Sequence, residues 1–191
     1  MADSKTIWIT LDTQIYYPQV FEVNRDKGDM HSETQGVTKV TLKLTDAQIE
    51  ELKSVGVPAT QLGYQTFKDV TIEGENFRAM TVKRPWVSKY LKDDVGEAQF
   101  VGAPMVFDFN KALAAWKESG SIGRIMQDHK TQWVTEDGLL GNGTKAKVKL
   151  SIYRGTNKAG KPTCVVQLEE IAIVDLVAYE GTPRGDGEVS F

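Results

Sequence analysis

Hydrophobic and polar residues alternate along much of this chain, which predicts a fold built mostly from β-strands. Apolar side chains occupy every second position across residues 7–11 and again across residues 40–44. A period of two is expected of strands that bury one face. Residues 67–73 and 77–83 flank Gly74-Glu75-Asn76, and this arrangement predicts a β-hairpin.

Two segments carry helix signals instead. Thr45 is the expected N-cap of the first helix, with Gln48 as its capping-box partner and Gly56 beyond its end. The second helix is expected over residues 109–119, after Asp108 as N-cap. Both segments place apolar residues at helical spacing, so each helix is expected to bury one side.

The longest predicted hairpin lies in the last quarter of the chain. Across residues 145–153, aliphatic side chains alternate with three lysines and a tyrosine, so one face is expected in the core and the other in solvent. Residues 157–162 form the predicted turn, and residues 163–179 are expected to return as a long strand. Residues 24–36 and 87–104 lack periodicity, and we expect loops there.

The order of these elements predicts a mainly β fold, a closed or nearly closed small barrel with two helices and loop insertions. The 191 residues, 40% of them hydrophobic, fit one domain, assigned to residues 1–182 and followed by a short acidic tail over residues 183–191. Cys164 is the single cysteine, which excludes an internal disulfide framework and suits a reducing cytosol. No stretch has the apolar length of a signal peptide or membrane span, so we expect a cytoplasmic protein without a membrane partner.

The net charge of −3 conceals two basic blocks that contain no acidic residue. Residues 141–162 hold six lysines and arginines, and residues 76–92 hold five. A polyanionic partner responds to such local clustering rather than to the sum of charges. Each block also contains aromatic residues.

Cations beside aromatic rings are the combination that binds single-stranded nucleic acid, because cations follow the phosphates and unpaired bases stack on the rings. The candidates for stacking are Trp86, Tyr90, Tyr153 and, from the first strand, Trp8. The candidates for phosphate contact are Lys83, Arg84, Lys89, Lys145, Lys147, Lys149 and Arg154. The alternatives are a solvated strand face for the lysines and a place in the core for the tryptophan that follows Pro85.

Arrangements typical of catalysis or metal binding find little support in the sequence. His31 and His129 have no partner at ligand spacing. Glu51 and Lys53 have the order seen in some nucleases, but they lie on the first predicted helix. We therefore expect a binding protein rather than an enzyme, without metal or cofactor. The alternatives left open are a metal-dependent nuclease or recombination enzyme, and a structural or assembly protein of a virion.

Residues 141–191 resemble the single-stranded DNA-binding proteins of tailed bacteriophages. The resemblance lies in Gly141-Asn142-Gly143-Thr144 before the lysine strand, the turn at residues 157–162, and Leu176-Val177-Ala178-Tyr179. Tyr17-Pro18-Gln19-Val20-Phe21-Glu22 is also similar to the family's early segment. The resemblance implies an OB-fold that coats single-stranded DNA with little sequence specificity in phage replication and recombination, assists annealing, and works in the cytoplasm of the infected bacterium.

The resemblance also implies a C-terminal tail that contacts replication proteins of the phage or its host. Carried over to this chain, that role falls on Asp186, Glu188 and Phe191. Tails of the family are usually more acidic than this one, which has two acidic side chains.

Overall fold

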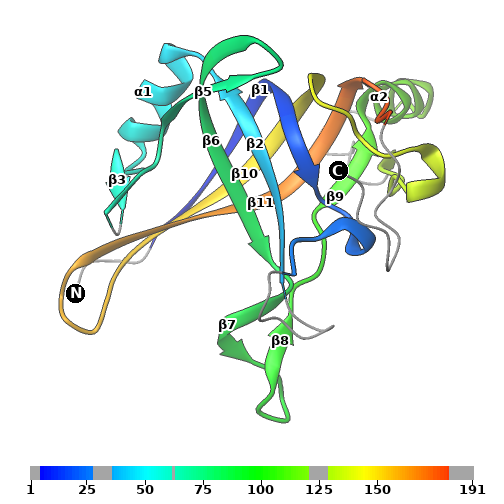
Figure 1. Ribbon diagram of the computed structural model, residues 1–191. Helices are drawn as coiled ribbons and strands as arrows, with labels where there is room; N and C mark the ends of the chain where they lie inside the picture. The colour runs from blue at the N-terminus through cyan, green and yellow to red at the C-terminus, as the bar shows by residue number, and fades with distance from the viewer. Residues whose placement is uncertain (1–4, 28–35, 62, 121–128, 181–191) are drawn as a thin grey trace.

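Five strands form a closed ring in the computed structural model of the protein, which describes residues 5–27, 36–61, 63–120 and 129–180 (Figure 1). They are β1 (Lys5–Gln19), β2 (Val37–Leu44), β6 (Glu75–Pro85), β10 (Thr144–Thr156) and β11 (Pro162–Asp175). Antiparallel pairing joins β6, β2, β1, β10 and β11 in that order, and β11 returns to β6 through a parallel pairing of Gln167 with Lys83. This small closed barrel is OB-fold-like and confirms the predicted fold class.

Shorter elements extend the ring. The strand β5 (Lys68–Ile72) pairs with β6, and β9 (Met105–Asp108) pairs with β11. Two separate hairpins join β3 (Thr60–Gln61) to β4 (Tyr64–Gln65) and β7 (Val87–Lys92) to β8 (Ala98–Phe100). The described chain also contains the helices α1 (Asp46–Ser54) and α2 (Phe109–Glu118) and two 3-10 turns, Glu22–Asn24 and Thr135–Asp137.

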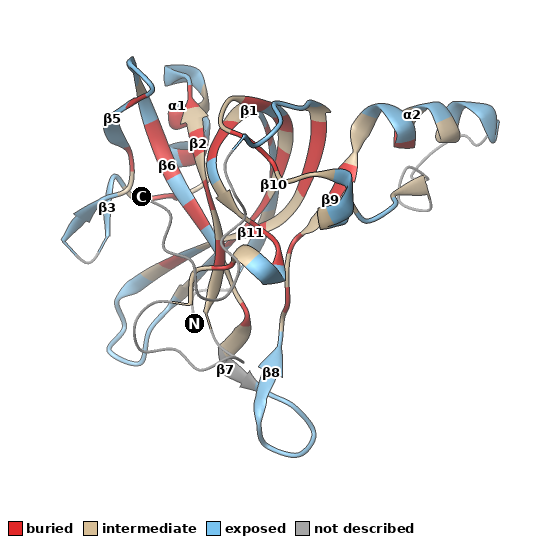
Figure 2. Cartoon of the chain, turned by 45° about the vertical axis from the view of Figure 1, so that its right-hand side comes forward, coloured by how far each residue is buried: buried red, intermediate tan, exposed pale blue. Residues whose placement is uncertain are grey.

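The core fills the inside of the ring, as the buried positions in Figure 2 show. Along β10 the small and aliphatic residues that alternate with the lysines are 0–2% exposed, so the predicted inner face of this strand is confirmed. They pack with residues of the other strands and of α1 in one cluster whose most enclosed members include Leu11, Ile15, Leu42, Leu52, Leu168 and Ile171. Burial of this face fixes the register of the strands, because a slip of one residue would turn it to solvent.

Both helices begin where the sequence predicts. The Thr45 hydroxyl accepts a hydrogen bond from the Gln48 backbone N–H, and the Gln48 side chain accepts one from the Thr45 N–H. The Asp108 carboxylate accepts a hydrogen bond from the Lys111 N–H at 2.9 Å. These contacts satisfy backbone donors that the first turn of a helix leaves free. No described helix combines the length and apolar character needed to cross a membrane.

Three predictions about elements were wrong in detail. The expected loop over residues 87–104 contains the hairpin β7–β8, which projects from the barrel (Figure 1) and lacks a periodic pattern because all of β8 is exposed. The strand β11 ends at Asp175, since Val177 instead accepts a hydrogen bond from the Gly141 N–H. The turn between β5 and β6 is Glu73-Gly74, one residue earlier than expected, and both residues have positive φ.

Candidate nucleic-acid interface

The outer face of β1 and β10 brings the lysines and two aromatic rings together. Trp8 lies opposite Ser151, and its ring is 58% exposed. Tyr153, two residues further along β10, is 44% exposed and lies diagonally across from Trp8. The lysine ladder, Lys145, Lys147 and Lys149, continues the same face because its members alternate with the buried positions of β10. Trp8, Tyr153 and the ladder are called the β1–β10 face below.

Lys149 is the lysine placed closest to an aromatic ring on this face. Its Nζ lies 5.1 Å from the centroid of the Trp8 ring, within the range of a cation–π interaction. Among the described residues it has no carboxylate within salt-bridge distance. Lys149 therefore lies beside an exposed ring without an ion-pair partner in the described part of the chain, because Glu170, opposite it on β11, is paired with Lys130.

Lys147 is already paired in the free protein. Its Nζ lies 2.7 Å from the Asp12 carboxylate on β1 and 5.2 Å from the centroid of the Phe109 ring on α2. Asp12 is largely exposed, so a phosphate could replace its carboxylate at Lys147 without a change in the fold. Lys145 lies opposite Gln14, is exposed, and has no acidic partner in the part of the chain that the structure describes.

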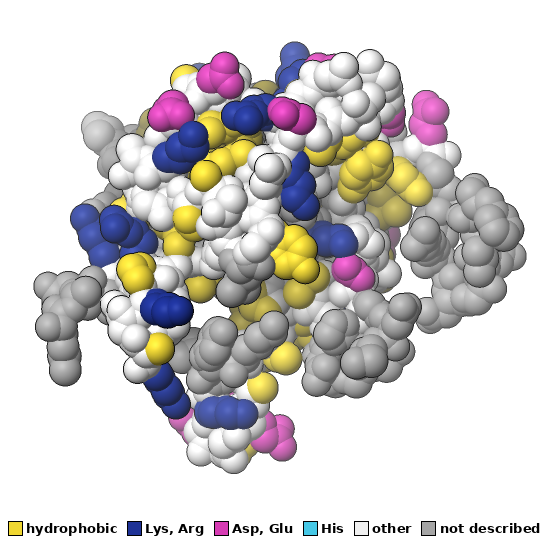
Figure 3. Space-filling view, turned by 60° about the vertical axis from the view of Figure 1, so that its left-hand side comes forward, with side chains coloured by type: hydrophobic (Ala, Val, Ile, Leu, Met, Phe, Trp, Pro, Cys, Tyr) yellow, Lys and Arg dark blue, Asp and Glu magenta, His cyan; other side chains and the backbone are white. Residues whose placement is uncertain are grey.

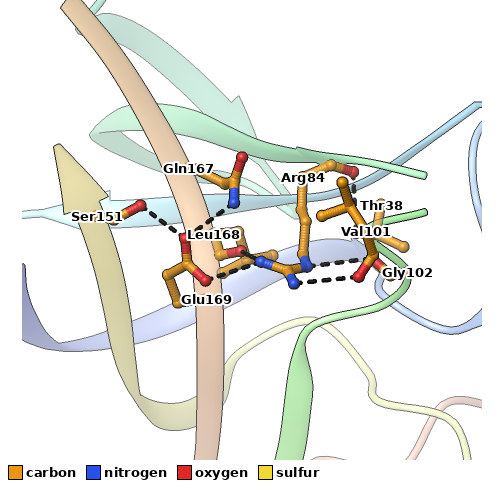
Figure 4. Close-up of polar contacts among 8 residues, drawn as sticks. All are labelled: Thr38, Arg84, Val101, Gly102, Ser151, Gln167, Leu168 and Glu169. Carbon is orange, nitrogen blue, oxygen red and sulfur yellow. Dashed lines mark hydrogen bonds and ion pairs between the residues drawn. The ribbon is translucent and has the colours of Figure 1, made fainter. Parts of the chain in front are cut away.

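Arg84 is placed differently from the prediction, in the seam between β6 and β11. Its guanidinium donates to the Glu169 carboxylate at 2.8 Å and to the backbone oxygens of Val101, Gly102 and Leu168 at 3.1–3.4 Å (Figure 4). Both side chains of the ion pair are less than one-fifth exposed. Since most of its N–H groups are used inside the protein, Arg84 closes the barrel rather than presenting a charge to solvent.

Trp86 is buried, not an exposed platform as expected. It is 9% exposed, the Arg25 guanidinium lies 4.4 Å from its ring centroid, and the Phe100 ring meets it edge to face at 5.2 Å. Its backbone oxygen accepts hydrogen bonds from the N–H groups of Val101 and Gly102. Trp86 thus holds the base of the β7–β8 hairpin against the barrel.

Two further cations lie away from the β1–β10 face. Arg154 follows Tyr153 and points to the opposite side of β10, where it covers Gly56 after α1; a Cβ at Gly56 would lie 2.5 Å from the Arg154 Nε. Lys83 is exposed on β6, in register with Lys39 on β2. Of the described candidates, Lys83 and Arg154 therefore lie apart from the ladder, whereas Arg84 lines one cavity together with Trp8 and Lys149.

Several predicted residues cannot be placed at this surface. Lys89 and Tyr90 belong to β7, but their side chains lie outside the described part of the structure. The predicted tail residues Asp186, Glu188 and Phe191 also lie outside the described residues.

On the face of the molecule that Figure 3 draws, positive charge is spread rather than concentrated in one patch. Figure 3 shows lysine and arginine side chains separated by hydrophobic and uncharged ones on one side of the molecule. The acidic residues that neutralise cations near the β1–β10 face are Asp12, Glu169 and Glu170, none of which the sequence singles out for that role. Asp12 follows Trp8 by four positions on β1, and residues an even number of positions apart on a strand share a face. This spacing is the sequence signal that places Asp12 on the β1–β10 face.

The remaining observations concern metal binding and the reactivity of the single cysteine. Within the described ranges no three His, Cys, Asp or Glu residues are grouped as a metal site requires. Cys164 is 8% exposed in the core, and burial raises the pKa of its thiol against the opposing effect of Arg154. A thiol held protonated in this way is a weak nucleophile.

Similar solved structures include the crystal structure of gp2.5, a single-stranded DNA-binding protein encoded by bacteriophage T7, with 19% sequence identity, a TM-score of 0.45 and full coverage of both chains. The single-stranded DNA-binding protein from bacteriophage Enc34 is 12% identical over 97% of this chain and 87% of its own, with a TM-score of 0.43. A C-terminal truncation of the Enc34 protein gives 10% identity, a TM-score of 0.41, and coverage of 95% and 88%. No protein-family model and no curated protein sequence matches this chain.

Proposed function

We propose that this protein binds single-stranded DNA through the β1–β10 face and coats it during bacteriophage replication and recombination, with little sequence specificity. The observation that carries the proposal is the register of β1 and β10, which places two exposed rings and three lysines on one side of the barrel. Rings supply stacking surfaces that accept every base, and cations supply phosphate contacts that carry no sequence information.

The arrangement favours single strands over duplex DNA. Trp8 and Tyr153 lie on a sheet rather than on a helix that could enter the major groove. In a duplex the base faces are covered by stacking, so they are not accessible to these rings. Lys149 and Lys145 are available to phosphates at once, and Lys147 becomes available when a phosphate displaces Asp12. Binding without catalysis is the role we propose.

The test compares fluorescence titrations of the full chain with labelled single-stranded and double-stranded DNA of equal length across salt concentrations. We expect tighter binding to the single strand and a linear fall of log K with log salt, because bound cations release counterions. Equal affinity for both forms, or no affinity for either, would contradict the proposal. Incubation of the single strand with protein and Mg²⁺ tests the nuclease alternative, for which degradation is the diagnostic result.

The tail and the cellular location complete the proposal. We propose that Asp186, Glu188 and Phe191 contact phage or host replication proteins, and that the protein acts in the cytoplasm of the infected bacterium. A variant that ends at residue 182 should keep its DNA affinity and lose co-purification with replication proteins. Undiminished co-purification would assign those contacts to another surface.

A further inference from the structure

A cavity of about 410 Å³ opens beside the β1–β10 face. Trp8 and Lys149 form one side of it, Glu170 lies on β11, and Met105 and Gln132 come from β9 and the segment before β10. Its volume lies within the range of about 300–1,000 Å³ that is typical of small-ligand sites. Its charged groups are the cations Lys149 and Arg84 and the carboxylates Glu169 and Glu170, so a ligand needs both acceptors and donors.

The two carboxylates at the cavity differ in what they can still bind. Glu169 has little capacity left, because it already accepts three hydrogen bonds, from Arg84, Ser151 and Gln167. Glu170 is held by Lys130, whose Nζ lies 3.1 and 3.0 Å from its two oxygens. Since each carboxylate oxygen has two lone-pair sites, Glu170 retains acceptor capacity on the side away from Lys130.

Lys149 and Trp8 supply the complementary groups. The Lys149 ammonium donates hydrogen bonds and accepts none, and among the described residues its charge has no carboxylate partner. The exposed Trp8 ring offers a flat apolar surface at the rim of the same cavity. A flat ligand with a ring acceptor near one N–H donor would satisfy Lys149, Glu170 and Trp8 together.

We propose that this cavity receives one nucleobase of the bound strand and prefers bases with an exocyclic amino group, above all cytosine, over thymine. The inference rests on the proposed function and adds a base-reading position to it. The cytosine amino group donates to Glu170, as carboxylates recognise cytosine elsewhere, while its ring nitrogen or O2 accepts from one of the three N–H groups of Lys149, whose others remain available to a phosphate. Thymine has a carbonyl oxygen in place of that amino group, so two acceptors would face each other.

The test measures fluorescence anisotropy of the full chain with 5′-labelled oligo(dC) and oligo(dT) of equal length, at a slightly alkaline pH and one salt concentration. One hydrogen bond gained or lost at the cavity should make oligo(dC) bind about threefold to tenfold more tightly than oligo(dT). Free dCMP, added as competitor in excess, distinguishes a site for strands from a site for free nucleotides. We expect dCMP to compete weakly, because it lacks the contacts of the neighbouring nucleotides.

Two variants assign the preference to the cavity. Glu170→Gln should abolish the preference while leaving oligo(dT) affinity unchanged or higher, because the amide can donate to the thymine carbonyl. Ala103→Leu, which fills the cavity and leaves the Glu170–Lys130 ion pair intact, should also abolish it. Glu51→Gln on α1 is the matched control and should keep the preference. Circular dichroism and thermal unfolding establish that each variant is folded.

The outcomes separate this inference from the proposed function. Tight and equal binding of oligo(dC) and oligo(dT) would overturn the base-reading site and leave the proposed function intact. Failure to bind either strand would overturn the proposed function itself. If folded Ala103→Leu still prefers oligo(dC), the base-reading site lies outside this cavity. If dCMP binds as tightly as oligo(dC), the ligand of the cavity is a free nucleotide rather than a base of the bound strand.

Discussion

Neighbouring lysines of one ladder differ in how their charge is used. Lys149 lies over the Trp8 ring without an acidic partner in the described structure, whereas Lys147 pairs with Asp12 across the β1–β10 ladder. Asp12 lies directly opposite Lys147 on β1 and pairs with it, whereas Glu170, which lies opposite Lys149 on β11, is already paired with Lys130. Each lysine is therefore expected to respond differently when its environment is changed.

Removing either lysine should lower DNA affinity and reduce its dependence on salt. On a single strand, each lost phosphate contact reduces the slope of log K against log salt by about 0.7. The measurement is a fluorescence titration of Lys147→Ala and Lys149→Ala across salt concentrations, with Lys53→Ala on α1 as the control. An unchanged slope in both ladder variants would remove the ladder from the interface.

Asp12→Asn should raise DNA affinity. The change frees Lys147 and removes a negative charge from the face, and an exposed ion pair of this kind contributes about 0.2–1 kcal/mol. The expected gain at low salt is therefore about twofold to fivefold, and it should shrink as salt is added. Asp46→Asn makes the same change in net charge on α1 and should leave affinity unaltered. Equal gains in the two variants would indicate an effect of net charge only.

At the scale of elements, the β7–β8 hairpin is held to the barrel at its base. The Trp86 N–H donates to the Gly36 oxygen at 3.0 Å, and its ring lies between Arg25 and Phe100. The rest of the hairpin projects outward (Figure 1), and Val95 at its turn is 81% exposed. Trp86 thus contacts the barrel side through Gly36 and Arg25 and the hairpin through Phe100.

Trp86→Ala should destabilise the protein by about 3–5 kcal/mol, the usual cost of truncating a buried aromatic side chain. Urea denaturation measures this loss. Compared with the original protein, hydrogen exchange in the variant should increase more in residues 86–102 than in β10. DNA affinity under conditions where the variant is folded should remain close to that of the original protein. A large loss of affinity with unchanged stability would return Trp86 to the binding surface.

At the scale of the whole molecule, closure of the barrel depends on a weak seam. In the described residues, β6 and β11 share a single paired position, Gln167 with Lys83, whereas β10 pairs with β11 along nearly its full length. Arg84 compensates by bonding to β11 through Glu169 and to the chain after β8 through backbone oxygens. The ion pair therefore substitutes for part of the missing ladder.

Arg84→Met should cost about 3–5 kcal/mol of unfolding free energy, because it leaves the partly buried Glu169 carboxylate without its cation. Adding Glu169→Leu should recover much of this loss, since replacing both partners by apolar groups is often nearly neutral. Urea denaturation of the single and double variants measures the difference. A double variant no more stable than Arg84→Met would show that the unpaired Glu169 charge matters less than the other hydrogen bonds lost, those of Arg84 to backbone oxygens and of Ser151 and Gln167 to Glu169.

Stability should fall in alkaline solution through Tyr16. Burial raises its pKa above the ordinary value of 10.0, and the nearby Glu75 carboxylate raises it further. The unfolded chain thus loses this proton at lower pH than the folded protein, so the stabilisation is complete below about pH 10 and is lost as pH rises through the folded pKa. In urea denaturation, the stability advantage over Tyr16→Phe should be complete below about pH 10 and shrink as the pH rises above that value. A constant difference would show that Tyr16 ionises alike in both states.

Elements with local signals could be predicted from the amino-acid pattern. Alternation defined the inner and outer faces of β10, and capping residues defined the starts of α1 and α2. The exposed side of Trp8 followed from the same period of two, because neighbours on a strand point to opposite faces.

Which distant residues meet became clear from the folded chain. Pairing of β1 with β10 set Asp12 against Lys147, and closure of the ring took Arg84 into the seam. Trp86 was buried by Arg25 and Phe100, which no spacing in the sequence connects to it. The physical reason is that local patterns fix which way a side chain points from its own strand, whereas its partners and its exposure depend on contacts made by the rest of the chain.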